Sequence, residues 1–394
     1  MEETMEPDKI WDCIVVGAGI EGSNTARYSA SLGKKTLCLE QFPLPHSRGS
    51  SHGQSRITRH SYDKKYYADM MPEAFALWEQ IERMAKEKLF INCGCLTIDS
   101  PPYTSINHVR DNLTSNGIKT EPVSNKELKE KYRLNFPSGH QGLLEPTGGM
   151  LLASKCLAAV QNQFVKFGGV LQDNEKVTDI VPGDIIHVKT NKGLYKTRKL
   201  ILTPGPWASS LLRPLGIDLQ LKPIRTSALY WKVKQSGFTA EENYPCVIDH
   251  TPDCVNIFNG TIYSLPCYEY PGMIKICLHN GPAINPDARD DVDYSWVEKN
   301  TSEYVRRYVM GVEGKPSITE HCIYTVSPDD DCTLDRHPKF DNIVIGVGFS
   351  GSGFKISPVV GKILFQLAFG LQPNYDMAPF KIARFQKSRI KSVL

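Results

Sequence analysis

The chain has 394 residues, of which 41% are hydrophobic and 23% are charged, and its net charge at pH 7 is +3. This length is enough for two or three domains, and the composition excludes an intrinsically disordered chain. The balanced charge, without a block of like charges, argues against nucleic acid as a partner, and no apolar stretch reaches the roughly 18 residues that a membrane span needs.

The N-terminus and the cysteines predict a reducing compartment. Residues 1–6 are acidic where a secretory signal peptide would be basic. The eleven cysteines, from Cys13 to Cys332, lie mostly in apolar runs, so we expect buried free thiols and no disulfide framework. Cys93 and Cys95 are a candidate metal or redox pair, but without a second Cys/His pair at ligand spacing no metal site is expected.

Residues 14–22 place a β-branched run before a GxGxxG pattern that opens an apolar-periodic stretch. This order predicts a strand, a tight turn and a helix whose N-terminus holds a pyrophosphate. Gly17 would permit the turn, Gly19 would let the backbone approach the pyrophosphate, and Gly22 would let the helix lie close to the strand. The pattern alone is weak evidence, and a glycine turn without a ligand remains the alternative.

A second predicted strand, residues 35–39, strengthens the nucleotide interpretation. It ends at Glu40, eighteen residues after Gly22, where a carboxylate can accept hydrogen bonds from a ribose diol. An acidic residue at this place favours an unphosphorylated adenosine, so FAD or NAD is expected rather than NADP.

The middle of the chain mixes helical and strand patterns. Apolar residues recur at helical spacing over residues 71–81 and 157–167, and we expect these faces to pack in the core. Residues 185–195 alternate around an Asn-Lys-Gly turn, which predicts a β-hairpin, and residues 199–203 predict another strand.

Near the C-terminus, residues 342–348 form a β-branched run that enters a glycine loop and then an apolar helical pattern through Leu367. This second strand, loop and helix is a candidate cradle for an anion or a carbonyl. Because the two units lie at opposite ends of the chain, with strand-rich segments between them, we expect a discontinuous nucleotide-binding domain interleaved with a second domain.

Lys275, in the strand-like segment 263–278, is a candidate functional residue. Alternation along a strand places it on one face with Met273 and Cys277, so a cation is expected to face a partly apolar interior. Burying a cation is costly unless an anion shares the space. The alternative is an edge-strand lysine in water that discourages strand pairing.

Several longer motifs together resemble a known family. They are residues 17–22 with Glu40, and residues 45–57, 322–325, 335–338 and 348–355. The chain resembles, over nearly its whole length, the monomeric sarcosine oxidase family of FAD-dependent amine oxidases, and most of all its animal branch of peroxisomal L-pipecolate/sarcosine oxidases. The resemblance implies an α/β fold in which a discontinuous Rossmann-like FAD-binding domain is interleaved with a mixed-sheet α+β substrate domain. The implied FAD-binding domain covers residues 8–91, 148–225 and 322–370, and the implied substrate domain covers residues 92–147, 226–321 and 371–390.

The resemblance implies that FAD is held covalently, through a thioether between the Cys322 sulfur and the 8α-methyl carbon of the flavin. A thiol is a suitable nucleophile for an oxidised flavin, and a thioether would raise the flavin's reduction potential. Without the family, Cys322 would be interpreted as one more buried structural cysteine. The other FAD-binding residues that the resemblance implies are Gly17, Ala18, Gly19, Gly22, Glu40, Ser51, His52, Arg56, Val177, Gly205, Gly348, Gly351, Gly353 and Lys355.

The resemblance also implies the substrate-binding residues. Arg59 and Lys355 match the family's carboxylate-binding pair, a role for which fixed positive charge is suited because a carboxylate that leaves water needs a charge-assisted partner. Arg56 matches an arginine near the flavin. Taken singly, each of these cations would be interpreted as an exposed surface charge.

Three further side chains, Tyr263, Tyr324 and His279, match residues around the substrate, although each alone would be interpreted as a half-buried structural residue. Lys275 matches the oxygen-activating lysine, whose ammonium stabilises the anion formed as O₂ is reduced. Ser352 departs from the pattern, because relatives commonly carry His at this position.

The implied activity is oxidation of a secondary amino acid, such as L-pipecolate, sarcosine or L-proline, at its C–N bond with O₂ as acceptor, which gives an imine and H₂O₂. Two alternatives stay open at this point. One is a flavin amine dehydrogenase that passes electrons to a carrier, and the other is a non-catalytic module that binds FAD or NAD.

The expected partners are a small secondary amino acid and O₂, with neither nucleic acid nor a membrane, and the expected state is a monomer. The resemblance implies a peroxisomal location, with the cytoplasm as the alternative. The C-terminal Ser392, Val393 and Leu394 form a weak peroxisomal address, because a basic residue normally precedes the final leucine.

Overall fold

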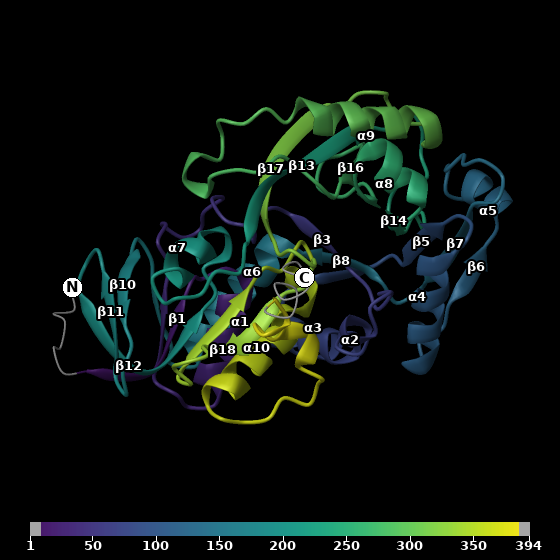
Figure 1. Ribbon diagram of the computed structural model, residues 1–394. Coiled ribbons are helices and arrows are strands. Elements are labelled where there is room, and N and C mark those ends of the chain that lie inside the picture. The colour runs from purple at the N-terminus through teal and green to yellow at the C-terminus, as the bar shows by residue number, and fades with distance from the viewer. Residues whose placement is uncertain (1–8, 386–394) are drawn as a thin grey trace, which may run out of the picture.

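The computed structural model describes residues 9–385, which form two eight-stranded β-sheets, one three-stranded sheet and the helices that pack on them (Figure 1). None of the helices in this part of the chain is long and apolar enough to cross a membrane.

The first sheet is built around β1 (Ile10–Val16), which pairs in parallel with β2 (Thr36–Leu39) and with β12 (Leu194–Leu202). β1 and β2 are buried along most of their length and β12 is buried at its last three residues, as is typical of a parallel sheet covered on both faces. The remaining strands of this sheet are β9 (Val170–Gln172), β10 (Val177–Val181), β11 (Ile186–Thr190), β18 (Thr333–Arg336) and β19 (Ile343–Val347).

Two glycine loops place helices α1 (Ile20–Ser31) and α10 (Gly353–Ala368) side by side against this sheet (Figure 1). The two helices approach closely because Gly361 faces α1, where a Cβ atom would lie 2.7 Å from the carbonyl carbon of Asn24. The N-termini of α1 and α10 both lie at the cavities described below. The same part of the molecule contains α2 (Lys65–Ala68), α3 (Met71–Ala85), α6 (Ala153–Lys166), α7 (Ala208–Leu212) and the 3₁₀ turns Gly205–Trp207 and Ala378–Phe380.

The second sheet is mostly antiparallel and has the strand order β17-β13-β16-β15-β14-β5-β7-β6. Figure 1 shows it arching over one side of the first sheet, with α8 (Pro252–Phe258) and α9 (Ser295–Tyr308) on its outer side. Its strands are β5 (Cys95–Asp99), β6 (Glu121–Val123), β7 (Gln141–Glu145), β13 (Lys222–Lys232), β14 (Cys246–Asp249), β15 (Ile262–Leu265), β16 (Met273–Leu278) and β17 (Ile318–Val326). The helices α4 (Thr104–Ser115) and α5 (Asn125–Glu130) and the 3₁₀ turn Pro286–Ala288 complete this half.

A small third sheet joins the two halves, with β8 (Gly149–Leu152) between β3 (Ser55–Thr58) and β4 (Phe90–Asn92). The long strand β17 also reaches from the second sheet toward the first. The cavities therefore form where β3, β17 and the two glycine loops meet.

Most elements expected from local patterns are present. The helices expected over residues 71–81 and 157–167 are α3 and α6, and the expected hairpin is the antiparallel pair β11 and β12. All eleven cysteines are free, as predicted. The domain boundaries remain a proposal, and β13 and β17 each run across one of them, at residues 225/226 and 321/322.

Candidate active site

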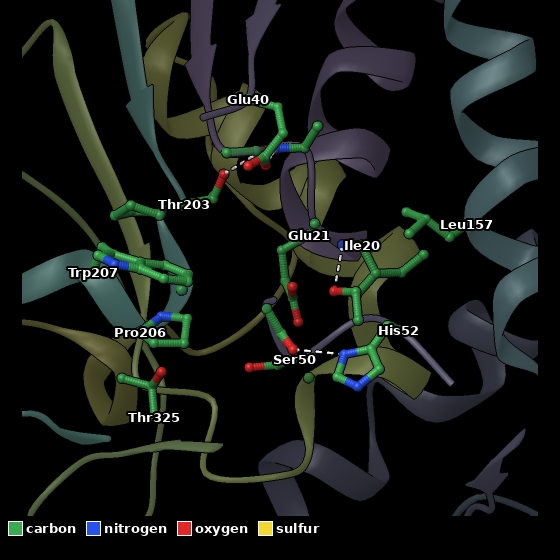
Figure 2. Close-up of a pocket in the computed structure, with 18 of the residues that line it drawn as sticks. Ile20, Glu21, Glu40, Ser50, His52, Leu157, Thr203, Pro206, Trp207 and Thr325 are labelled. Atoms are coloured by element: carbon green, nitrogen blue, oxygen red, sulfur yellow. Dashed lines mark hydrogen bonds between the residues drawn. The ribbon is translucent and has the colours of Figure 1, made fainter. Parts of the chain in front are cut away.

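A first cavity of about 290 Å³ lies beside the glycine turn between β1 and α1. In Figure 2, Glu40 lies at one end of this cavity, and Ser50, His52 and Thr325 lie at the other. Its walls include most residues that the sequence assigned to FAD: Gly17, Ala18, Gly19, Glu40, Ser51, His52, Arg56, Val177, Gly205, Gly348, Gly351 and Gly353.

The glycine turn has the geometry that its sequence predicts. Gly17 has a φ of +96°, and a Cβ atom there would lie 2.4 Å from the carbonyl oxygen of Thr203 on the neighbouring strand. Gly22 does not line the cavity. A Cβ atom at Gly22 would lie 1.9 Å from the carbonyl oxygen of Gly17, so its role is to let α1 pack on β1, as expected.

The polar groups around this turn are held in place by contacts with one another. Glu40 accepts a hydrogen bond from the Ala18 amide through Oε2 at 2.9 Å, and its Oε1 lies 3.4 Å from His46 Nε2. The Ile20 amide, at the N-terminus of α1, donates to Ser51 Oγ at 2.9 Å. A carboxylate at a strand end and a helix N-terminus over a glycine turn suit the ribose and the pyrophosphate of a dinucleotide, so these residues fit FAD.

Glu21 adds an acidic side chain to the same cavity. It belongs to the first turn of α1, and Figure 2 shows it pointing into the cavity between Glu40 and Ser50. Burial raises the pKa of its carboxyl to about 7. The protonated form can lie beside a diphosphate without charge repulsion.

A second cavity, of about 890 Å³, adjoins the first and shares with it His52, Arg56, Tyr324 and Gly351 among its lining residues. The structure brings together here all the side chains that the sequence assigned to chemistry. These are Arg56, Arg59, Tyr263, Lys275, His279, Cys322, Tyr324 and Lys355.

Arg59 and Lys355 form a cationic pair in this second cavity. Both lie over the ring of Tyr62, with the Arg59 Cζ at 4.4 Å and the Lys355 Nζ at 5.6 Å from its centroid. Arg59 is only 9% exposed, and its Nε and Nη1 have no hydrogen-bond partner among residues 9–385. Burial and the nearby Arg59 lower the pKa of Lys355 to about 7. A buried arginine with unpartnered donors beside a half-buried lysine makes a receptor for a carboxylate.

A buried carboxylate holds the backbone that carries Arg59. Arg59 follows directly on β3, and the next two amides, those of His60 and Ser61, donate to Glu145 at the end of β7. His60 Nδ1 is also 2.7 Å from Glu145 Oε1. These contacts fix the position from which Arg59 enters the cavity.

Cys322 lies on β17 at the junction of the two cavities. Its Sγ is 3.5 Å from the Ser50 carbonyl oxygen and 3.8 Å from Arg56 Nη2. Arg56 in turn donates to the carbonyl oxygens of Ser50, Ser55 and His52. The thiol therefore faces the loop that lines both cavities and lies beside a fixed positive charge.

Three aromatic side chains form another wall. The ring centroid of His279 lies 5.0 Å from that of Tyr324 and 6.3 Å from that of Tyr263. Burial and the neighbouring Lys355 lower the pKa of His279 to about 4, so the ring is neutral at pH 7. Gly351, with a φ of +84°, leaves room for this wall, because a Cβ atom there would lie 2.4 Å from His279 Cε1.

Lys275 is buried, as its position on β16 predicts, and an anion shares the space. Its Nζ lies 3.0 Å from Glu269 Oε1, and the two side chains are only 7% and 3% exposed. Glu269 also accepts hydrogen bonds from Ser55 and Tyr230. The alternative of an exposed edge-strand lysine was wrong, because β16 lies inside the sheet between β13 and β15.

Sequence reasoning missed several residues of the site. Tyr62, Glu145, Glu269 and Tyr230 were not singled out, because a tyrosine or a glutamate in a loop or strand carries no local signal of its partner. The Cys93 thiol lies 3.8 Å from that of Cys246 on β14, a neighbour that no pattern in the sequence predicts. Among the described residues no group of three or more His, Cys, Asp or Glu side chains could hold a metal ion.

Comparison with known proteins agrees with the geometry that the chain is suited to bind FAD. Residues 12–367 match the DAO family model, described as FAD dependent oxidoreductase. The chain is 43% identical to peroxisomal sarcosine oxidase of Mus musculus, over 95% of this chain and 96% of that protein. It is 31% identical to monomeric sarcosine oxidase of Bacillus sp. (strain NS-129), over 95% and 97% of the two chains.

Among solved structures, NikD, an unusual amino acid oxidase essential for nikkomycin biosynthesis, has the same fold, with a TM-score of 0.81, 22% identity and coverage of 95% of this chain and 97% of its own. These relatives do not support the alternative of a non-catalytic module. The chain belongs to the DAO family of FAD-dependent oxidoreductases, and within it to the group of sarcosine oxidase-type amine oxidases.

Proposed function

We propose that the protein oxidises secondary amino acids of the size of sarcosine, L-proline and L-pipecolate at the C–N bond, with O₂ as acceptor, and releases an imine and H₂O₂. The observation that carries this proposal is the pair of cations Arg59 and Lys355 in the cavity that Cys322 and Tyr324 also line, with two buried Arg59 donors that have no partner among the described residues. FAD held in the first cavity would supply the redox chemistry, as the acceptor of a hydride, which carries both electrons, from the carbon next to nitrogen and as the donor of those two electrons to O₂.

The side chains of the second cavity would seat and orient the substrate. Arg59 and Lys355 would bind its carboxylate, and the aromatic wall of Tyr263, His279 and Tyr324 would exclude water from the amine. Because burial and Lys355 lower the pKa of His279 to about 4, the ring is neutral at pH 7 and adds no positive charge beside the amine, which would react as the neutral base.

The experiment that tests the function is a substrate panel on the yellow holoenzyme with two readouts, peroxide released and substrate consumed. We expect close to one H₂O₂ per secondary amino acid, and little turnover of the matching amines that lack the carboxylate. A flavin dehydrogenase would reduce an added electron carrier while it released little peroxide. No anaerobic bleaching of the flavin by any secondary amino acid would contradict the proposal altogether.

We also propose that FAD is bound covalently through Cys322. The closeness of its thiol to the loop that lines both cavities, and to the positive charge of Arg56, supports this role, because the thiolate is the nucleophilic form. Acid precipitation should leave yellow protein in the parent and in Cys267→Ser, whose cysteine is also half-buried and lies outside both cavities. It should release all FAD from Cys322→Ser. FAD that came away from the parent would contradict the linkage.

Lys275 is proposed as the group that assists the reduction of O₂. A buried ammonium in the cavity wall lowers the free energy of an anion formed beside it. In Lys275→Met, substrate should bleach the flavin anaerobically at the parent rate, while re-oxidation in air slows by on the order of 10²-fold or more. Equal re-oxidation rates would refute this role.

We propose that the protein is monomeric, as the name of its Bacillus relative suggests, and that it works in peroxisomes, as the names of its mammalian relatives suggest. The expected address, Ser392 to Leu394, lies outside the described residues. Imaging a chain with a free C-terminus beside one that lacks Leu394 tests the location, because only the first should enter peroxisomes.

A further inference from the structure

Behind Lys275, a chain of hydrogen-bonding side chains runs through the second sheet to Glu320, which also lines the second cavity. Lys275 Nζ contacts Glu269 Oε1, and Glu269 Oε2 accepts a hydrogen bond from the Tyr230 hydroxyl. The same hydroxyl lies 3.1 Å from Glu320 Oε2, and the Tyr270 hydroxyl donates to Glu320 Oε1 at 2.5 Å. Five side chains therefore form one continuous path.

The register of the second sheet puts these groups on one face. Tyr230 on β13 pairs directly with Lys275 on β16, so their side chains lie on the same side of the sheet. On the other side of β13, Glu320 of β17 pairs with Ala228, two residues from Tyr230, and two residues is the period of one face. Strands β13, β16 and β17 lie together in Figure 1.

The two ends of the path both line the second cavity, whereas its middle does not. Lys275 and Glu320 are lining residues, and Tyr230 and Glu269 lie outside the lining. Tyr230 is 1% exposed and Lys275 is 6% exposed, whereas Glu320 and Tyr270 are half-buried. A proton on the less buried Glu320 would thus reach Lys275 through hydrogen-bonding side chains.

The number of protons available to Tyr230 and its neighbours shows how the path can transfer a proton. The Tyr230 hydroxyl has one proton but two carboxylate neighbours, Glu269 and Glu320. When it donates to Glu269, its contact with Glu320 is a hydrogen bond only if Glu320 itself carries a proton. Burial and the carboxylates of Glu269 and Glu320 raise the pKa of Tyr230 above its ordinary range, so the hydroxyl stays neutral and passes one proton on as it receives another.

We propose that Glu320, Tyr230 and Glu269 form a proton path that returns to Lys275 the proton used in reducing O₂, with Glu269 also positioning the ammonium. The inference rests on the proposed role of Lys275. The O₂ half-reaction consumes one proton, since the two-electron-reduced FAD anion, O₂ and H⁺ yield oxidised FAD and H₂O₂. Lys275 gives that proton to the reduced oxygen, Glu269 re-protonates Lys275, and Tyr230 relays the replacement from Glu320.

Other titratable groups near Lys275 do not offer a competing path. Arg56 of β3 faces Glu269 and remains a cation. The thiols of Cys277 on β16 and Cys246 on β14 also face Lys275, and burial raises the pKa of both, so they stay protonated at neutral pH. Ser55 donates to Glu269 and bears no charge.

The test is Tyr230→Phe in the holoenzyme, because this change removes the relaying hydroxyl and keeps the ring and the Lys275–Glu269 pair. Anaerobic bleaching by substrate should be unchanged, and re-oxidation by O₂ should slow about 10²-fold, the lower end of what positioned proton transfer contributes. A small weak acid in the buffer, such as imidazolium, should restore part of the rate. A purely structural loss would not respond to added acid.

A matched control exists elsewhere in the molecule. Tyr375 donates to Glu73, which pairs with Lys362 at 2.6 Å, so the same three residue types meet there, outside both cavities. Tyr375→Phe should re-oxidise at the parent rate. A readout without turnover is a pH jump on the oxidised holoenzyme, in which the flavin absorbance change that follows the jump should slow in Tyr230→Phe and not in Tyr375→Phe.

The outcomes separate the two proposals. If Lys275→Met re-oxidises at the parent rate, Lys275 does not assist the reduction of O₂, and the proposed proton path is contradicted as well. If Lys275→Met is slow while Tyr230→Phe and Glu320→Gln match the parent in re-oxidation and in the pH jump, the path alone is wrong. Glu320→Gln cuts the path at its outer end, so it serves if Tyr230→Phe does not fold, and it should give the same slow, acid-rescued re-oxidation.

Discussion

At the scale of single residues, the charge of Lys355 controls how the cavity holds an anion. Its pKa is lowered to about 7, by burial and then by Arg59, so the side chain is a cation below pH 7 and neutral above it. A bound carboxylate favours the charged form and raises this pKa, so binding above pH 7 must take up a proton.

We therefore expect the affinity for an unreactive carboxylate, such as acetate, to fall by about tenfold per pH unit above pH 7 until the pKa of the liganded state is reached. Perturbation of the flavin spectrum measures this affinity. Lys355→Met should bind the carboxylate weakly and without this pH dependence. An identical slope in both proteins would show that Lys355 is not the titrating group.

Glu21 gives a second prediction at this scale. Its pKa, raised to about 7 by burial, means that it loses its proton as the pH rises through neutrality, and its charge then opposes a diphosphate at the N-terminus of α1. In a Cys322→Ser background, where FAD binding should be reversible, FAD affinity should decrease above pH 7. In Cys322→Ser with Glu21→Gln the affinity should be nearly constant, and equal pH profiles would contradict this account.

At the scale of elements, the link between β3 and β7 determines where Arg59 lies. The carboxylate of Glu145 accepts the amides of His60 and Ser61 and faces the His60 ring, all in a buried setting. Hydrogen bonds to a charged partner contribute more than neutral ones, and an unsatisfied buried donor is costly.

Glu145→Gln should therefore lower the free energy of unfolding by about 2 kcal/mol and also weaken carboxylate binding, because the segment that carries Arg59 loses its anchor. Chemical denaturation and the flavin titration measure the two effects. Glu127→Gln, in the exposed capping box of α5, is the control and should leave carboxylate affinity unchanged. A stable Glu145→Gln with unchanged affinity would disprove the anchoring role.

At the scale of the whole molecule, the features predicted from the sequence are those with local signals. The glycine turn at Gly17, Glu40 at a strand end, the hairpin and the helix after the second glycine loop all follow from short patterns, and the structure has them. The positions of Arg59, Lys355 and Cys322 came from longer motifs that resemble a family.

The partners of these residues could not be predicted, because sheet register and domain packing select them. Glu269 and Tyr230 are 39 residues apart in the chain, and His60 and Glu145 are 85 apart. Neither glutamate belongs to a motif. The fold brings them to buried cations and amides, where the cost of an unpaired charge makes them necessary.

The central claim is that two cations, Arg59 and Lys355, bind an amino-acid carboxylate beside the flavin. Anaerobic titration of the holoenzyme with sarcosine and with dimethylamine, which lacks the carboxylate, tests it most directly when repeated on Arg59→Ala. The account predicts that the parent flavin is bleached at far lower concentrations of sarcosine than of dimethylamine, and that Arg59→Ala loses most of this preference. An Arg59→Ala enzyme that kept the full preference for sarcosine would contradict the claim.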